Sequence, residues 1–157
     1  YTLICVDAYR PPYIPWHLTT RVFFQQVADH LTSDGVLAIN VGRSPTDRTL
    51  IDDLASTLQT VFASVHVVDV PYSYNTLVYA TAQSTAPANL AANLLSLTER
   101  GDVHPLLLQS LQVAVGNAQP TPPVDVVYTD DWSPIEWVTN NMVLNTVLFG
   151  DLDLIGQ

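Results

Sequence analysis

The sequence contains no lysine, and its 157 residues include five arginines against fifteen acidic side chains, which gives a formal net charge of −10. The arginines are scattered along the chain, at Arg10, Arg21, Arg43, Arg48 and Arg100. Because neighbouring cations are needed to follow a row of phosphates, we expect no binding to nucleic acid or to an anionic membrane.

Long apolar runs are absent as well. The longest, such as residues 3–6 and 106–108, fall far short of the roughly 18 residues that a membrane-spanning helix needs. The single cysteine, Cys5, excludes an internal disulfide, and its place in an apolar run predicts a buried and unreactive thiol. With 48% hydrophobic residues, the chain is expected to form a soluble, compact domain of the cytoplasm.

Two kinds of ligand site lack their sequence signatures. The four histidines show no His-x-x-x-His spacing and a second cysteine is missing, so no metal site is expected. No two glycines stand closer than six positions, and residues 42–45 lack the lysine of a phosphate-binding loop. We therefore expect no glycine-rich nucleotide cradle within these residues.

What the sequence does contain, over residues 1–83, is an alternation of short β-branched runs with helical periods, which predicts an α/β sheet. The predicted strands, in their expected spatial order, are residues 2–6, 36–41, 76–82 and 65–70. The last two are separated by five residues, too few for a crossover helix, so they are expected to pair as an antiparallel hairpin. The sheet is therefore predicted to be mixed, with strand 2–6 covered on both faces.

Helices are predicted between these strands. Apolar residues recur every four positions over 23–31 after a possible cap at Thr19 or Thr20. Residues 44–47 read as a capping box with Pro45 at the first helical position. Three acidic residues are expected near the start of that second helix or on its solvated face: Asp47, Asp52 and Asp53.

The composition changes after Gln83. Two leucine-rich helices are predicted, one ending near residues 100–101 and one after Pro105, and the proline-rich stretch 118–123 is expected to be a surface linker. A last helix should begin at Ser133 and end near residue 149. We therefore divide the chain into a sheet-forming part, 1–83, and a helical extension, 84–157.

Asp7 is the strongest candidate for a chemical role. It follows the apolar strand 2–6, at the carboxyl end where open α/β sheets place their ligand crevice. The loop that follows is rich in proline and aromatic residues, which either pack among themselves or form one wall of a ligand site. The competing interpretation is that the Asp7 carboxylate only accepts hydrogen bonds from the loop backbone.

Five segments in order resemble the spermidine synthase, or polyamine aminopropyltransferase, family of the S-adenosylmethionine methyltransferase-like superfamily. They are residues 1–7, 17–24, 31–40, 71–78 and 129–136. The resemblance covers about the first 82 residues and parts of the tail. It implies a chain that forms the C-terminal half of a methyltransferase-like Rossmann sheet, mixed and with an antiparallel hairpin, followed by a helical extension.

The resemblance also implies an activity, the transfer of an aminopropyl group from decarboxylated S-adenosylmethionine to a polyamine, without a tightly bound cofactor. Asp7 would be the catalytic carboxylate, because an amine with a pKa of about 10.4 must lose a proton before it attacks carbon. The residues that the resemblance places near the acceptor are Tyr9, Tyr72, Tyr74, Asp130 and Asp131. For the last two, the residues themselves favour the competing interpretation of a charged approach to the capped helix at Ser133.

Two departures from the family pattern keep alternatives open. Family members usually carry Asp-Ser-Ser-Asp-Pro at this strand end, whereas residues 7–11 place Arg10 at the second acid. Two alternatives therefore stay open. The protein could be a different S-adenosylmethionine-dependent enzyme, such as a methyltransferase, or a non-catalytic assembly module on the same fold. Because the glycine-rich turn of the family is missing here, we expect the co-substrate cradle to lie upstream of Tyr1. The open edge of strand 2–6 is then expected to pair with a second copy or with that missing half.

Overall fold

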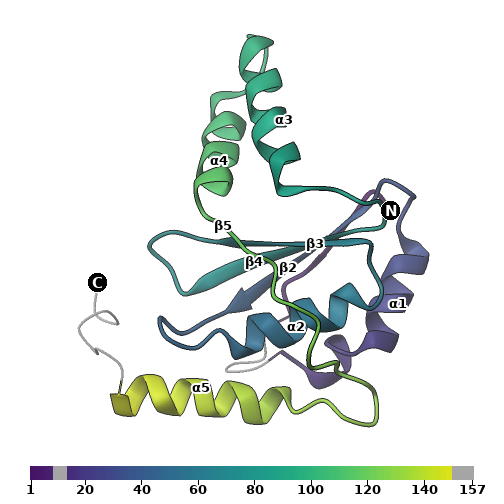
Figure 1. Cartoon of the computed structure of the whole chain (residues 1–157), viewed down its shortest axis with the longest axis vertical. Coiled ribbons are helices and arrows are strands. Elements are labelled where there is room, and N and C mark those ends of the chain that lie inside the picture. Colours follow the sequence, from purple (N-terminus) through teal and green to yellow (C-terminus); the bar gives the residue numbers. More distant parts are fainter. Residues whose placement is uncertain (9–13, 150–157) are drawn as a thin grey trace.

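The computed structural model describes residues 1–8 and 14–149, and its strands form one mixed sheet (Figure 1). The strands are β1 (Leu3–Val6), β2 (Val36–Gly42), β3 (Ser64–Asp69), β4 (Asn75–Thr81) and β5 (Ala118–Gln119). Their order is β1-β2-β4-β3-β5, and β1 and β2 are parallel while the other pairs are antiparallel. The four strands predicted from the sequence, their order and the hairpin are confirmed.

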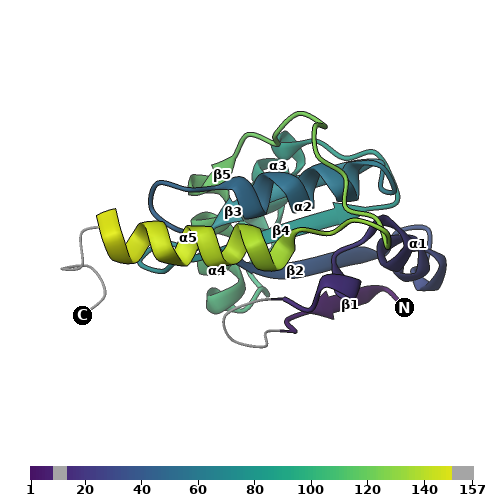
Figure 2. The ribbon, with the colours of Figure 1, turned by 90° about the horizontal axis from the view of Figure 1, so that it is seen from below.

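Helices cover the two faces of the sheet unequally (Figures 1 and 2). One face carries α1 (Arg21–His30), α2 (Thr49–Gln59) and α5 (Ile135–Phe149), and a short 3-10 helix, η1 (Trp16–Leu18), precedes α1. The other face carries a hairpin of α3 (Pro87–Glu99) and α4 (Pro105–Gly116). None of the helices in the described residues is long and apolar enough to cross a membrane.

The core lies between the sheet and the layer formed by α1, α2 and α5. Alternate side chains of β2, such as Leu37 and Val41, are fully buried against this layer, as period-2 patterning requires. Phe24 of α1 and Leu54 of α2 fill the space opposite them. Each such side chain contributes roughly 1.5–3 kcal/mol through burial, so this face holds the fold together.

Two helix starts test the capping predictions. Thr20 caps α1, because its Oγ1 accepts a hydrogen bond from the backbone N–H of Phe23 at 3.3 Å. The start predicted for α2 is wrong: the helix begins at Thr49, four residues after Pro45. The acceptor for the first helical amide is Asp47, whose Oδ1 lies 2.9 Å from the N–H of Thr49, while Ser44 Oγ closes a separate turn.

The edge strand β1 departs from expectation. Leu3 is 55% exposed and the Cys5 thiol is also exposed, so the predictions that this strand is covered on both faces and that Cys5 is buried are wrong. The reason is that β1 lies at the edge of the sheet and only its Ile4 and Val6 side turns toward α1. Within the described residues, β1 pairs with β2 alone, as the open-edge expectation required.

The α3–α4 hairpin is attached to β3 at both ends. Before α3, the backbone N–H of Thr85 donates to Ser64 Oγ at 2.9 Å. After α4, β5 pairs with β3, with Ala118 opposite Val68. The prediction that residues 118–123 are only a surface linker is therefore wrong at residues 118–119, because their backbone completes the hydrogen bonding of β3.

Candidate functional site

Asp7 and Asn40 form the polar centre of the carboxyl edge of the sheet. Because β1 and β2 are parallel and Val6 lies opposite Ile39, Asp7 and Asn40 are at the same level of the two neighbouring strands. The Asn40 side-chain amide donates to Asp7 Oδ1 at 3.2 Å, and the Asp7 side chain is exposed. The bond orients one carboxylate oxygen and leaves the other available to a ligand.

Asn40 was missed as a site residue. The rule that selected Asp7 does not select Asn40, because Asn40 lies inside β2 and is followed by the fully buried Val41. Asn40 is level with Asp7 only through the register of the parallel pair, in which Val6 lies opposite Ile39. The sequence alone does not give that register.

The turn between β3 and β4 lies at the same edge. The backbone N–H of Arg43, just after β2, donates to the carbonyl of Tyr74 at 2.7 Å. Tyr72 is fully exposed and has a φ of 59°, a left-handed conformation that costs a non-glycine residue about 1–2 kcal/mol. The structure therefore places Tyr72 and Tyr74 near the carboxyl end of β2, at the same edge of the sheet where Asp7 follows the parallel strand β1.

A charged network anchors this turn to the sheet. Arg48 donates two hydrogen bonds to the Asp69 carboxylate, at 2.9 and 3.2 Å, and Thr76 Oγ1 donates a third at 2.7 Å. Arg43 lies 3.6 Å from the same carboxylate and donates through Nη2 to the carbonyl of Ser73 at 3.0 Å. Burial opposes ionisation of Asp69, but the hydrogen bonds from Arg48 and Thr76 outweigh it, so the pKa of Asp69 is lowered.

Asp130 and Asp131 lie in a different place. They line a cavity of about 650 Å³ together with Glu136 and the indoles of Trp16 and Trp137. This wall carries three carboxylates and no cation, and aromatic faces together with carboxylates suit a ligand ammonium group. Asp7 does not line this cavity, so the structure does not bring the predicted acidic residues together.

Asp53 and Tyr128 are a further pair that the sequence did not indicate. Tyr128 is completely buried, and its hydroxyl donates to Asp53 Oδ2 at 2.7 Å, while its backbone N–H donates to Thr57 Oγ1 at 3.0 Å. Burial raises the pKa of Asp53. The expectation that Asp53 lies on the solvated face is wrong, because α2 turns it toward the segment that precedes α5.

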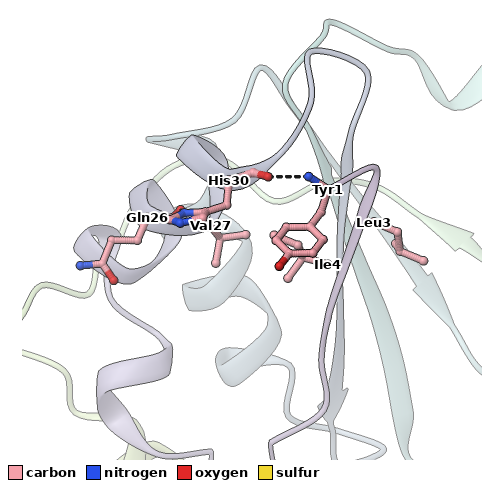
Figure 3. Close-up of a pocket in the computed structure, with 6 residues that line it drawn as sticks. All are labelled: Tyr1, Leu3, Ile4, Gln26, Val27 and His30. Carbon is pink, nitrogen blue, oxygen red and sulfur yellow. Dashed lines mark hydrogen bonds between the residues drawn. The ribbon is translucent and has the colours of Figure 1, made fainter.

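Three further features bear on where a ligand could bind. The predicted residue Tyr9, and Arg10 beside it, lie outside the described residues. Between β1 and α1 there is an apolar recess of about 460 Å³, where the amino group of Tyr1 donates to the carbonyl of His30 at 2.7 Å (Figure 3). Over residues 1–8 and 14–149, no cluster of three or more metal-binding side chains is found.

Comparison with known proteins gives this geometry a family context. A probable polyamine aminopropyl transferase of Bifidobacterium longum (strain NCC 2705) is 29% identical over 149 residues, which cover 87% of this chain and 33% of that protein. The chain is similar to part of a polyamine aminopropyltransferase. The resemblance predicted from the sequence is thus confirmed, over about one third of the relative's length. No family model matches the chain.

Solved structures support the same fold. A probable spermidine synthase from Corynebacterium glutamicum ATCC 13032 superposes with a TM-score of 0.53 at 16% identity, covering 90% of this chain and 44% of that one. Human Methyltransferase-like protein 13 in complex with SAH gives a TM-score of 0.51 at 20% identity, with 76% and 50% covered. The fold of this aminopropyltransferase-like chain is therefore the α/β, methyltransferase-like Rossmann fold that was predicted.

Proposed function

We propose that this chain supplies the catalytic carboxylate and part of the acceptor site of an aminopropyltransferase, which moves an aminopropyl group from decarboxylated S-adenosylmethionine to a polyamine. The similarity to the Bifidobacterium protein supports the reaction class. The observation that carries the proposal is the position of Asp7, an exposed carboxylate at the carboxyl edge of the sheet, held by the amide of Asn40.

The proposed step is a direct displacement at carbon. The nitrogen of the acceptor amine forms a bond to the methylene carbon beside the sulfonium, the carbon–sulfur bond breaks, and its electron pair stays on sulfur as a neutral thioether. The nitrogen must be unprotonated to attack, although its pKa of about 10.4 keeps most of it protonated at neutral pH. Asp7 attracts the ammonium and accepts its proton through the oxygen that Asn40 leaves free.

Acceptor binding is proposed at two places. Tyr72 and Tyr74 flank the reacting amine, since their turn lies at the same edge as Asp7. Asp130 and Asp131 hold a distal ammonium of a long polyamine in the cavity beside Trp16, where cation–π contact adds to the charge attraction. The net charge of −10 favours the approach of a polycation. Tyr9, two positions after Asp7 in the sequence, remains a proposed contact.

The test is a transfer assay on the full-length protein that contains this chain. Decarboxylated S-adenosylmethionine labelled in the aminopropyl group is incubated with a panel of diamines, triamines and tetraamines, and labelled polyamine is separated by chromatography. We expect a product that is one aminopropyl group longer than its acceptor. If no acceptor in the panel yields labelled product, the proposal is wrong.

A methyltransferase on the same fold is the second candidate. The superposition on Methyltransferase-like protein 13 favours it at the level of the fold. The same full-length protein is incubated with S-adenosylmethionine labelled in the methyl group and the same amines. Label in the amine from this donor, with none from the decarboxylated donor, would assign methyl transfer instead.

A further inference from the structure

The α3–α4 hairpin stands over the face of the sheet opposite the core (Figure 1). Residues of β3, β4 and this hairpin line a cavity of about 460 Å³. Its floor includes His66 and Tyr79, and its roof includes Leu90 of α3 and Leu111 of α4. None of the residues proposed for aminopropyl transfer lines it. The volume falls within the range of small-molecule sites, roughly 300–1,000 Å³.

The cavity wall carries no charge. Its lining contains no aspartate, glutamate or arginine, and two of its side chains, His66 and Tyr79, titrate. Burial lowers the pKa of His66 and raises the pKa of Tyr79, so both rings are neutral near pH 7. Although the chain has a net charge of −10, none of that charge lies in this wall. The wall therefore has no group that could balance the charge of a bound ammonium or anion. A neutral ligand fits it best.

Two aromatic residues of the floor lie opposite each other on neighbouring strands. His66 and Tyr79 are direct cross-strand partners on adjacent strands, so both rings stand on the same face of the sheet. The His66 ring is fixed by a 2.7 Å hydrogen bond between its Nε2 and Thr85 Oγ1. Neighbouring flat rings with apolar side chains above them favour a planar, aromatic occupant.

Polar groups without protein partners border the same space. Within the part of the chain that the structure describes, the Tyr79 hydroxyl and the side chains of Asn93 and Ser110 have no hydrogen-bond partner in the protein, and Asn93 and Ser110 are exposed to solvent. They come from the sheet, α3 and α4 respectively. Groups that converge from three elements on a mainly apolar cavity give a ligand its orientation.

The cavity is not a packing defect of the core. Neither α3 nor α4 buries a single side chain, whereas a core helix such as α2 buries seven residues. The hairpin is held at its ends by Thr85 and by β5, and it stands over the sheet with Leu107 of its inner wall 47% exposed. Apolar surface left in water costs about 25 cal/mol per Å², which an occupant of the cavity would recover.

We propose that this cavity is a binding site for a neutral, planar aromatic molecule that carries at least one hydrogen-bonding group. The flat body lies between Leu111 and the rings of His66 and Tyr79, and its polar edge meets the Tyr79 hydroxyl or Asn93. The site is separate from the Asp7 edge and does not depend on the proposed transferase reaction.

The probe for the test is N-phenyl-1-naphthylamine, a neutral aromatic amine whose fluorescence rises when it leaves water. It is titrated into the 157-residue chain and into variants that differ in one position. Ala114→Phe fills the cavity from α4, and Ser110→Phe does so from a position that is exposed and should not disturb folding. The matched control is Ala92→Phe, which adds the same side chain at an exposed site of α3 outside the lining.

We expect saturable binding of one probe per chain, weakened at least tenfold by Ala114→Phe and by Ser110→Phe, and changed less than twofold by Ala92→Phe. Circular dichroism shows that each variant is folded before it is titrated. If the probe does not saturate, or if it binds the cavity-filling variants as tightly as the control, the proposal is overturned. The second outcome would place the probe elsewhere, for example in the recess beside Tyr1.

Discussion

The Tyr128 hydroxyl lies 2.7 Å from Asp53 Oδ2, across 75 residues of sequence, and joins the segment before α5 to α2. The pairing is reinforced by the bond from the Tyr128 backbone N–H to Thr57 Oγ1 at 3.0 Å. Both contacts hold the last helix in the layer that covers the core. A residue that looked like a surface acid therefore contributes to the attachment of the C-terminal segment.

Tyr128→Phe tests this attachment. The substitution keeps the ring in its buried position but leaves the half-buried Asp53 carboxylate without its donor, so the free energy of unfolding should fall by about 1–2 kcal/mol. Urea denaturation followed by circular dichroism measures it. Tyr72→Phe is the matched control, because the Tyr72 side chain is fully exposed and its change should stay within about 0.5 kcal/mol. Equal effects in the two variants would contradict the prediction.

The Asp69 network should make stability depend on pH in a definite direction. Although burial opposes it, hydrogen bonding to Arg48 and Thr76 lowers the pKa of Asp69 in the folded state. Its contribution is therefore complete above the unfolded pKa of about 4 and is lost as the pH falls through the lower folded-state value.

Asp69→Asn should lower the free energy of unfolding by about 2 kcal/mol at pH 7, because it removes the charge that pairs with Arg48. The difference in unfolding free energy from the unmodified chain should narrow as the pH falls below about 4, the unfolded-state pKa of aspartate. Urea titrations at several pH values measure this, with Asp34→Asn as an exposed control. If the difference in unfolding free energy between the two chains grew as the pH fell, the prediction would be contradicted.

Asp7→Asn should abolish transfer without unfolding the protein. If the full-length protein is active, loss of the carboxylate should lower kcat/KM by roughly 10²- to 10⁴-fold, the usual contribution of a general base. Asp34→Asn removes an exposed carboxylate from the connection between α1 and β2 and should leave the rate unchanged. Full activity in Asp7→Asn would restrict Asp7 to the alternative role of binding its own loop.

The exposed Cys5 thiol gives a direct test of the edge position of β1. N-Ethylmaleimide should label it completely in the native chain, and mass spectrometry would show one adduct without denaturant. A sample unfolded in urea sets the rate for full exposure. Labelling that begins only in urea would mean that this face of β1 is covered.

Backbone conformation at two turns predicts opposite effects. Tyr72 has a φ of 59°, so Tyr72→Gly should relieve strain and raise the free energy of unfolding by about 1 kcal/mol. Gly101 has a φ of +70° with open space around its missing side chain, so Gly101→Ala should lower it by about 1 kcal/mol through backbone strain alone. Thermal unfolding would show shifts of opposite sign, and shifts of the same sign would contradict the conformational argument.

The sheet could be predicted because its signals are local. The β-branched runs predict β1 to β4. The connection 71–75 is too short for a crossover helix, so it predicts an antiparallel hairpin of β3 and β4 without any information from the rest of the chain. Asp7 followed from a rule of the same kind, since the residue after a buried parallel strand reaches the ligand-binding edge. The apolar run around Cys5, however, is the same for a central strand as for an edge strand. Whether this strand is buried depends on whether another strand pairs with its free edge, and no local pattern in the sequence shows that.

The errors elsewhere share that origin. Ser44 and Asp47 can each accept a hydrogen bond from a helix N-terminus, and the structure uses Asp47 for α2. The Tyr128–Asp53 bond joins residues too far apart to leave a period in the sequence. The two-residue strand β5 is shorter than any alternation can mark. Each outcome was decided by tertiary contacts that act on a locally ambiguous segment.

The way in which the α3–α4 hairpin is attached has a consequence for how such a molecule can be altered. The chain leaves the sheet at the end of β4, is fixed to β3 through Thr85, passes through both helices, and returns to β3 at Ala118. Replacement of both helices by a connection of different length would preserve the strand order and would remove no buried side chain. The hairpin, and with it the proposed aromatic-binding cavity, could therefore be replaced as a unit while the edge of the sheet that carries Asp7 stays intact.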